Sequence, residues 1–344
     1  MSLAYRSESH GNAVTTVKDI AQLANVSVAT VSRTFRSPDR VAQKTRERVL
    51  KAAKETGFQP DALAQIFRTG RSNAIMVLVP NISNPFFSKV LRSMQATASE
   101  RGYSVVLGDT NGQKNRETAY GAFFSRRQAD GLIQLGPRAP QSFLSCPVTP
   151  SSPIVHACEG PRRSRYPSVR IDNADAAEAM TQHLVDTGRR RIAVLTGPPA
   201  GPLTRERLRG WKKCLEQSNL QTDDRLVLTG DFTLNAGSEG AKRLLELSPR
   251  PDALFCFNDE MAIGAVQTLK GAGLRIPRDI AVAGFDDIDV ARFCDPPLTT
   301  IAQPKSHIGS MAMEMVLGLI DDKKIERLNR VLKAKLVIRD STVD

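Results

Sequence analysis

Thr16-Val-Lys-Asp-Ile-Ala-Gln-Leu-Ala-Asn-Val-Ser-Val-Ala-Thr-Val-Ser-Arg-Thr-Phe35 is the stretch that decides the fold of the N-terminal part of this chain. It predicts two short helices separated by a break at Ala24-Asn25-Val26. Thr16 caps the first helix, with Asp19 three residues further on as in a capping box, and Ser27 caps the second helix. Apolar residues recur at helical spacing and predict one buried face, made of Ile20, Leu23, Val26 and Val31. The pattern indicates a helix-turn-helix, whose second helix suits the major groove of DNA.

A third amphipathic helix is predicted from Gln43 to Thr56, with Gly57 as its C-cap. An ordinary helical hairpin is the alternative interpretation, and the length of the following match speaks against it. The segment resembles the LacI/GalR family of bacterial repressors, whose head reads V-x-D-[VI]-A-x-x-A-x-V-S-x-x-T-V-S-R. The matching residues are Val17, Asp19, Ile20, Ala21, Ala24, Val26, Ser27, Thr30, Val31, Ser32 and Arg33.

Length and hydropathy place the chain among multidomain proteins without a membrane span. The chain has 344 residues, so two or three domains are expected. Hydrophobic residues make up 41%, and no apolar run approaches the length that crosses a membrane. The N-terminus lacks the apolar core of a secretory signal, so a cytoplasmic location is expected, with residues 1–14 as a disordered tail.

Positive charge is concentrated in the N-terminal segment. The formal net charge is +12, and residues 1–72 hold 12 Lys and Arg against 6 Asp and Glu. A basic excess is often only a solvated face, but on a helix-turn-helix it is typical of a phosphate-binding surface.

The five cysteines are scattered, at Cys146, Cys158, Cys214, Cys256 and Cys294, with no C-x-x-C spacing. Neither a zinc site nor a disulfide framework is predicted, and the thiols are expected to be reduced and mostly buried. No cofactor is expected.

From Asn73 onward, short apolar runs alternate with amphipathic segments. The predicted strands are 74–80, 104–109, 131–135, 154–157, 191–197, 225–229, 253–257 and 280–285, with a terminal strand at 336–342. The predicted helices are 85–101, 116–128, 174–187, 203–218, 236–247 and 260–271. Such alternation predicts parallel sheets that are covered on both faces, with small ligands bound at the carboxyl ends of the strands.

This second part resembles the effector domain of the same family, which is akin to periplasmic sugar-binding proteins. The segments that carry the resemblance are 79–87, 257–264, 284–289 and 296–304. The resemblance implies an α/β fold class, with a helix-turn-helix headpiece before a periplasmic-binding-protein-like body of two doubly wound parallel-sheet subdomains. The expected divisions are a headpiece at 15–59, a hinge at 60–72 and a body at 73–344, with one subdomain at 73–170 and 298–331 and the other at 171–297 and 332–344. No leucine heptads follow, so a homodimer is expected rather than a tetramer.

The resemblance assigns DNA contacts within the head. Val28, Ala29 and Arg33 are the positions that face base edges: the first two suit thymine methyl groups, and arginine can donate two bonds to guanine. Val28 and Ala29 are equally compatible with plain helix surface. Caps and phosphate contacts are expected from Thr16, Ser27, Thr30, Ser32 and Thr45.

Residues 60–68 resemble the family's hinge helix, which orders on operator DNA and lies in the minor groove. Ala64 and Gln65 match the hinge pattern. Phe67 stands where the family usually has a leucine that wedges between base pairs, and such apolar wedges kink duplexes. A flexible linker with one aromatic residue is the alternative.

Eight residues fall on the family's ligand positions, where the resemblance implies a small-molecule cleft. Carboxylate and amide groups can hydrogen-bond hydroxyls, an arginine supplies a donor fork, and phenylalanines offer flat faces. The alternative for each residue is a purely structural role, as a helix cap or in core packing. The residues are Asn84, Phe86, Phe87, Arg207, Phe232, Asn258, Asp286 and Gln303.

The inventory suits a ring-bearing polyol, either a sugar or a nucleoside. The segments 293–304 and 230–233 most resemble cytidine-responsive members of the family. The expected function is therefore a sequence-specific DNA-binding repressor that binds a palindromic operator and responds to a nucleoside such as cytidine; a sugar-responsive regulator is the alternative.

Two other function classes fit the sequence poorly. An enzyme would need a reactive constellation, but the glycine-rich segment 197–202 lacks the Lys-Ser/Thr of a phosphate loop, and the four histidines show no metal or triad spacing. A solute-binding protein for transport would need a signal peptide and no basic head.

Overall fold

The computed structural model describes residues 16–36, 38–56, 71–138, 142, 144–147, 152–160, 166–323 and 328–343. The expected disordered tail, Gly57 and residues 60–70 of the expected hinge lie outside the described residues. The chain forms two compact units, which divide between Ser72 and Asn73, and each is described by itself.

The first unit, called the head below, is a bundle of three helices. Its elements are α1 (Val17–Leu23), α2 (Val28–Arg36), the short 3-10 helix η1 (Pro38–Arg40) and α3 (Gln43–Thr56). The three α-helices pack on one apolar core, made of Ile20, Ala21, Ala24, Val31, Val49, Ala52 and Ala53.

Local hydrogen bonds fix the starts of α1 and α2. The Asp19 N–H donates to Thr16 Oγ1 at 3.4 Å and the Thr16 N–H donates to Asp19 Oδ2 at 2.7 Å, which is a reciprocal capping box. The Thr30 N–H donates to Ser27 Oγ at 3.1 Å. Between the helices, Asn25 takes a φ of 47°, a left-handed conformation that asparagine tolerates. The predicted N-caps Thr16 and Ser27 are therefore confirmed.

Leu23 corrects the predicted buried face of the head. Its side chain is 62% exposed, whereas Ala24 is buried. The helices approach closely at this point, because the Arg48 guanidinium of α3 donates to the Ala24 carbonyl and to the Asn25 carbonyl. A small side chain fits this approach, and Leu23 is turned outward.

The second unit, called the body, has two lobes. The first lobe holds a six-stranded sheet of order β11-β5-β4-β3-β1-β2, and all its neighbouring strands are parallel. Its strands are β1 (Ala74–Val79), β2 (Ser104–Asp109), β3 (Gly131–Gln134), β4 (Ile154–Ala157), β5 (Ser168–Ile171) and β11 (Asn329–Leu332). Its helices are α5 (Pro85–Glu100), α6 (Lys114–Ser125) and α11 (Lys305–Ile320).

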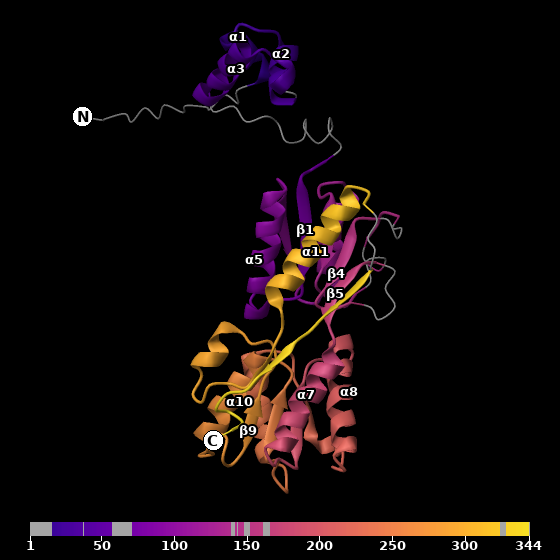
Figure 1. The fold of residues 1–344 in the computed structure, drawn as a ribbon, viewed down its shortest axis with the longest axis vertical. Helices are drawn as coiled ribbons and strands as arrows, with labels where there is room; N and C mark the ends of the chain where they lie inside the picture. The colour runs from indigo at the N-terminus through magenta and orange to yellow at the C-terminus, as the bar shows by residue number, and fades with distance from the viewer. Residues whose placement is uncertain are drawn as a thin grey trace, which may run out of the picture. The chain divides into compact units, whose positions relative to one another are not determined.

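Both faces of this sheet are covered. Alternate residues of β1 point to opposite faces: Ile75 and Val77 join the core that includes α5 and α11, while Met76 and Leu78 join a separate cluster with Tyr120 of α6. Figure 1 shows α5 and α11 beside β1.

The second lobe holds a four-stranded parallel sheet of order β7-β6-β8-β9. Helix α7 packs on α8 and α9 packs on α10, as expected when right-handed crossovers cover both faces of the sheet. The strands are β6 (Ile192–Thr196), β7 (Val227–Thr229), β8 (Ala253–Cys256) and β9 (Ala281–Ala283). The helices are α7 (Asn173–Asp186), α8 (Pro202–Gln217), α9 (Leu234–Leu245) and α10 (Asp259–Gly271), with 3-10 helices η3 (Asp224–Leu226) and η4 (Asp289–Phe293).

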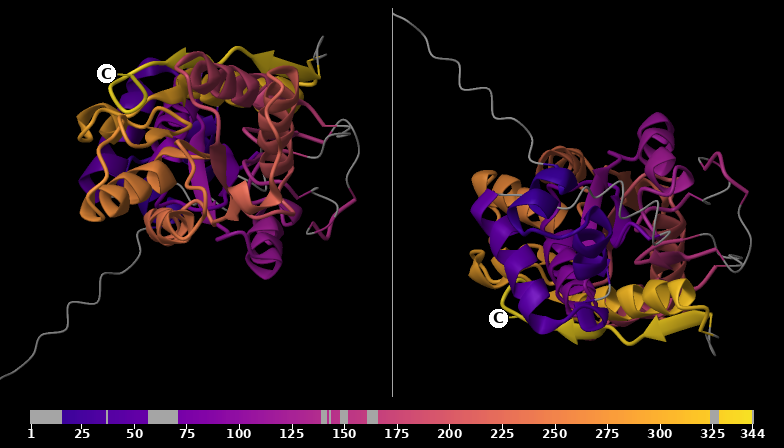
Figure 2. Two further views of the ribbon diagram at one scale, coloured as in Figure 1. Left: turned by 90° about the horizontal axis from the view of Figure 1, so that it is seen from below. Right: turned by 90° about the horizontal axis from the view of Figure 1, so that it is seen from above.

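The chain passes from lobe to lobe between β5 and α7, between β9 and α11, and between β11 and the C-terminus. Strands β10 (Thr300–Ala302) and β12 (Lys335–Val337) pair antiparallel in the second and third passages. The two views of Figure 2 show the last strands, in yellow, along one side of the body. Residues that follow the strands of both sheets therefore line one space between the lobes.

The predicted terminal strand is too long. Strand β12 ends at Val337, and the residues that follow are held in the second lobe by isolated backbone and side-chain hydrogen bonds instead of a continuous ladder. Ser341 Oγ accepts from the Thr299 N–H at 2.8 Å, and Thr342 Oγ1 lies 2.8 Å from His183 Nε2.

The other predicted strands and helices of the body are confirmed within a few residues at each end. Among the described β-strands and α-helices of the body, β5, β10, β11 and α11 had no prediction, and neither had the 3-10 helices η3 and η4. Of the helices the structure describes, none is long and apolar enough to cross a membrane.

Candidate DNA-reading head and ligand pocket

Helix α2 presents the side chains predicted to read DNA. Val28, Ala29 and Arg33 are exposed, and Val28 keeps 44% of its surface accessible. No hydrogen bond or ion pair engages the Arg33 side chain within the described part of the head. Its guanidinium is therefore available to a partner outside the head.

The predicted phosphate-contacting residues surround these positions. Ser27 and Thr30 lie together at the start of α2, with their hydroxyl oxygens 2.9 Å apart. Ser32 and Thr45 are half-buried, and Thr16 is exposed. The hinge predictions Ala64 and Phe67 lie outside the described residues.

The body contains a pocket of about 740 Å³ between its lobes. It is bounded by the carboxyl ends of strands, as open α/β sheets lead one to expect. All eight residues predicted for a ligand line it: Asn84, Phe86, Phe87, Arg207, Phe232, Asn258, Asp286 and Gln303.

The first lobe supplies an aromatic wall. Asn84 is the N-cap of α5, and its Oδ1 accepts from the Phe86 N–H at 2.9 Å. This cap fixes the first turn of α5, which carries Phe86 and Phe87 with ring centres 5.1 Å apart in an edge-to-face pair. Phe86 is buried and Phe87 is only partly buried, so Phe87 offers the more accessible ring.

Arg207 reaches the pocket from α8 of the second lobe, where it is buried. Its Nε donates to Asn173 Oδ1 at 3.0 Å, and Nη1 donates to the Phe257 carbonyl. Its guanidinium lies 3.5 Å from the centre of the Phe285 ring. Burial lowers the pKa of Arg207 to about 10, so the group remains charged at neutral pH. These contacts hold a cation rigidly at the pocket wall.

Asp286 faces this cation. Its Oδ1 lies 4.0 Å from an Arg207 nitrogen and accepts from Gln303 Nε2 at 2.7 Å. Burial raises the pKa of Asp286 to about 6, while Arg207 opposes the rise. The carboxyl is therefore mostly ionised at neutral pH, and its second oxygen can accept hydrogen bonds from a ligand.

Buried contacts behind Asp286 hold its unusual backbone. Asp286 has a φ of 115°, a conformation that non-glycine residues rarely adopt. Asp259, fully buried at the start of α10, accepts from the Ile288 N–H at 2.8 Å and from Thr300 Oγ1 at 2.5 Å. The Lys305 ammonium donates to the Asp286 carbonyl. The direction of the Asp286 carboxylate thus depends on groups from three separate segments.

Asn258 acts first as a support in this structure. Its Oδ1 accepts from the Met261 N–H at 3.0 Å and caps α10, while its Nδ2 donates to the Phe232 carbonyl at 2.8 Å. After these two bonds, Asn258 Oδ1 keeps one lone pair that can accept from a ligand hydroxyl, as expected, and Nδ2 keeps one hydrogen that can be donated to a ligand.

Phe232 lies over Gly197, which follows β6. A Cβ atom on Gly197 would sit 1.9 Å from Phe232 Cζ, so only glycine leaves room for the ring. Phe232 itself has a φ of 70°. The glycine at position 197 is therefore explained by the packing of Phe232 and not by phosphate binding.

Gly197→Ala is accordingly expected to displace the Phe232 ring. We expect effector affinity to fall about 3- to 10-fold and stability by about 1–3 kcal/mol, the usual cost of overpacking. Calorimetric titration and thermal unfolding measure the two effects. Gly271→Ala is the matched control, because nothing lies within 4 Å of the added Cβ, and equal effects of the two changes would contradict the role of Gly197.

Several pocket residues were not predicted. Thr204 is buried and its hydroxyl has no hydrogen-bond partner among the described residues, so it is free to meet a ligand. Arg138 of the first lobe is oriented by Glu117 Oε2, 2.8 Å from its Nε. Glu159 follows β4, and it could have been predicted because ligands bind at the carboxyl ends of parallel strands. No local signal marks Thr204 or Arg138.

Similarity to known proteins agrees with this arrangement. Residues 16–61 match the family described as bacterial regulatory proteins, lacI family, and residues 181–342 match the periplasmic binding protein-like domain. The chain is 39% identical to the HTH-type transcriptional repressor CytR of Escherichia coli strain K12, over 95% of this chain and 96% of that protein. It is 32% identical to the HTH-type transcriptional repressor PurR of Photobacterium profundum, over 96% and 99% of the two chains.

Solved structures show the same likeness. The Lac repressor dimer bound to operator and the anti-inducer ONPF matches with a TM-score of 0.85 and 27% identity, over 96% of this chain and 99% of that chain. The transcriptional regulator CelR in complex with cellobiose matches with a TM-score of 0.71 and 29% identity, over 95% and 99%. The head, the two-lobed body and these relatives together show that the chain is a DNA-binding transcriptional repressor with a ligand-binding domain, and that it belongs to the lacI family of bacterial regulatory proteins.

Proposed function

We propose that a nucleoside, cytidine or a close analogue, controls the operator affinity of this repressor by binding in the pocket between the lobes. The observation that carries the proposal is the convergence of the Arg207–Asp286–Gln303 group with three phenylalanines on one pocket. A ribose can exchange hydrogen bonds with the polar group, and a flat base can stack on an aromatic wall. The likeness of segments 230–233 and 293–304 to cytidine-responsive relatives favours a nucleoside over a plain sugar.

We further propose that the repressor acts in the cytoplasm as a homodimer, with two heads on a palindromic operator. Half-sites would lie about one helical turn apart. The Lac repressor dimer bound to operator supports this assembly. Residues 60–72 would form the hinge that couples the head to the body, and the divisions near Ile171, Pro297 and Leu332 would separate the two subdomains. We also propose that the chain binds its effector without transforming it.

Effector binding and DNA binding are coupled through thermodynamic linkage. A ligand shifts DNA affinity only by the difference between its affinities for the DNA-binding state and the other state. Lobe closure around the pocket is the conformational change that such a ligand would bias. Lys89 of α5 and Asp289 of η4 form an ion pair across the lobes, so relative lobe movement would break or make it.

The test is a thermal-shift panel of nucleosides, pentoses and disaccharides on the purified chain. We expect cytidine at about 100 times its dissociation constant to raise the unfolding free energy by about 2.7 kcal/mol, which corresponds to a shift of several degrees.

Ribose alone is the control for the sugar part and is expected to give little shift. A disaccharide that stabilises the protein while every nucleoside fails would replace the proposal with the sugar-responsive alternative, which the CelR–cellobiose likeness represents.

A further inference from the structure

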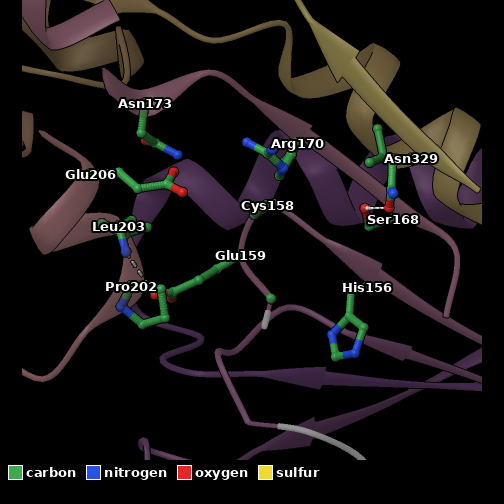
Figure 3. Close-up of a pocket in the computed structure, with 12 residues that line it drawn as sticks. His156, Cys158, Glu159, Ser168, Arg170, Asn173, Pro202, Leu203, Glu206 and Asn329 are labelled. Atoms are coloured by element: carbon green, nitrogen blue, oxygen red, sulfur yellow. Dashed lines mark hydrogen bonds between the residues drawn. The ribbon is translucent and has the colours of Figure 1, made fainter. Parts of the chain in front are cut away.

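A second, smaller pocket of about 80 Å³ adjoins the effector pocket, and we call it the side chamber. The two pockets share Cys158, Glu159, Pro202 and Leu203 in their walls. Other residues line the side chamber but not the effector pocket, among them His156, Arg170, Asn173 and Glu206 (Figure 3). A ligand in the large pocket therefore borders the side chamber along Glu159.

His156 is a buried polar side chain of the side chamber that lacks hydrogen-bond partners among the described residues. The residue is 1% exposed, yet neither ring nitrogen has a hydrogen-bond partner among the described residues. Burial lowers the pKa of His156 to about 4, so the ring is neutral at physiological pH and offers one donor and one acceptor. Buried polar atoms are normally paired, which points to water or a ligand as the missing partner.

Two carboxylates make the side chamber rich in acceptors. Glu159 comes from the first lobe and Glu206 from α8 of the second lobe, and no ion pair within 4.0 Å engages either in the described structure. Arg170 contributes donors, and one of its nitrogens donates to the Ile171 carbonyl at 3.2 Å. The chamber thus offers acceptors beside donors, a combination suited to a neutral group with both kinds of atom.

Glu159 is the carboxylate that both pockets share. The N-cap of α8 is Gly201, which has no side chain for capping, and the Leu203 N–H donates instead to Glu159 Oε1 at 3.4 Å. Figure 3 shows the Glu159 side chain directed to Leu203 and Pro202. This single long bond leaves most of the acceptor capacity of the carboxylate unused.

We propose that the side chamber belongs to the effector site and that Glu159 there accepts a hydrogen bond from an exocyclic amino group of the effector. The inference rests on the proposed nucleoside function and adds the determinant of base choice. Burial raises the pKa of Glu159, while the Leu203 N–H and the Arg207 charge oppose the rise. In its ionised form the carboxylate only accepts hydrogen bonds, and it pairs with the amino group of cytosine. The keto oxygen at the same position of uracil would face the carboxylate with lone pairs. Glu159 therefore selects amino-bearing bases over keto bases.

The experiment titrates the full-length protein and its Glu159→Gln variant with cytidine and with uridine by calorimetry. Glutamine keeps the length of the side chain and an oxygen for the Leu203 N–H, so the α8 start is preserved. Because a bond to a charged group is worth more than a neutral one, we expect the unaltered protein to prefer cytidine by about 10- to 100-fold. In the variant the amide can turn either its oxygen or its NH₂ to the base, so the preference is expected to fall to about threefold or less.

Glu206→Gln is the matched control, since it removes a carboxylate from the same chamber at a position outside the shared wall. It is expected to retain the cytidine preference. Thermal unfolding and operator binding without effector check that both variants fold.

The outcomes separate the inference from the function on which it rests. If the unaltered protein binds no nucleoside, the proposed function fails. If it binds cytidine and uridine equally, or if Glu159→Gln keeps the preference, only the role of Glu159 is overturned. Loss of the preference in Glu206→Gln alone would transfer the role to the other carboxylate and would also overturn it.

Discussion

Asp286→Ala is expected to weaken effector binding by about 100-fold or more, because the carboxylate is placed to accept two charge-assisted hydrogen bonds worth about 1.5–3 kcal/mol each. Asp286 lies in the pocket wall beside Arg207, and Gln303 orients its carboxylate. Operator binding without effector is expected to stay within about threefold, since the head forms a separate compact unit with its own core. Mobility-shift titrations with and without effector measure both quantities.

The alanine variant also leaves Arg207 without a buried counter-charge, so a loss of stability must be distinguished from a loss of binding. Thermal unfolding without effector makes this distinction, and Asp286→Asn, which keeps the shape of the side chain while removing its charge, separates the loss of packing from the loss of charge. It too is expected to bind effector more weakly. Glu239→Ala removes an exposed carboxylate of α9 that pairs with Lys242, and it controls for net charge. An unchanged effector response in Asp286→Ala would exclude the pocket as the effector site.

Arg33→Ala is expected to remove most of the preference for operator over scrambled DNA. A bidentate arginine–guanine contact contributes about 1–3 kcal/mol of discrimination, and a dimer on two half-sites loses it twice, which amounts to about 30-fold or more. Arg33 is exposed on α2 and no contact within the described head restrains its side chain, so folding is not expected to suffer. Competition footprinting on cognate and scrambled duplexes at fixed salt measures the ratio.

Lys51→Ala provides the comparison for Arg33. Lys51 is an exposed residue of α3, and its Nζ lies 3.9 Å from Glu55 Oε1. Loss of a phosphate-contacting or uninvolved lysine changes the affinity for both duplexes equally and leaves the ratio unchanged. If Arg33→Ala behaves in the same way as Lys51→Ala, α2 does not read bases through Arg33.

The local signals of the head were sufficient for its helices and caps. Thr16, Asp19 and Ser27 act within three residues of their partners, so a short window of sequence contains the whole interaction. Leu23 was misassigned because positions three and four residues apart lie on the same helix face. Only the close approach of α3, with Arg48 against the end of α1, selects alanine at the neighbouring position.

Helix α11 illustrates a different limit. Its sequence, KSHIGSMAMEMVLGLI, is apolar on most sides and carries two glycines, so no amphipathic period marks it. The helix is buried against α5 and the sheet of the first lobe, which explains its composition. Strands β5, β10 and β11 are short segments whose partners lie far along the chain, and local propensity is weak for such strands.

The sequence by itself determined the head, the alternation of strands and helices, and, through its likeness to a known family, which residues to expect near a ligand. The tertiary structure alone decided how these residues meet. Asn84, Arg207 and Asp286 are far apart in sequence. Three passages of the chain between the lobes bring them to one pocket.

The same passages set Glu159 against the start of α8 and enclose His156, whose ring nitrogens have no hydrogen-bond partner among the described residues. No local pattern encodes such contacts, because they depend on the relative position of two sheets whose strands are interleaved in sequence.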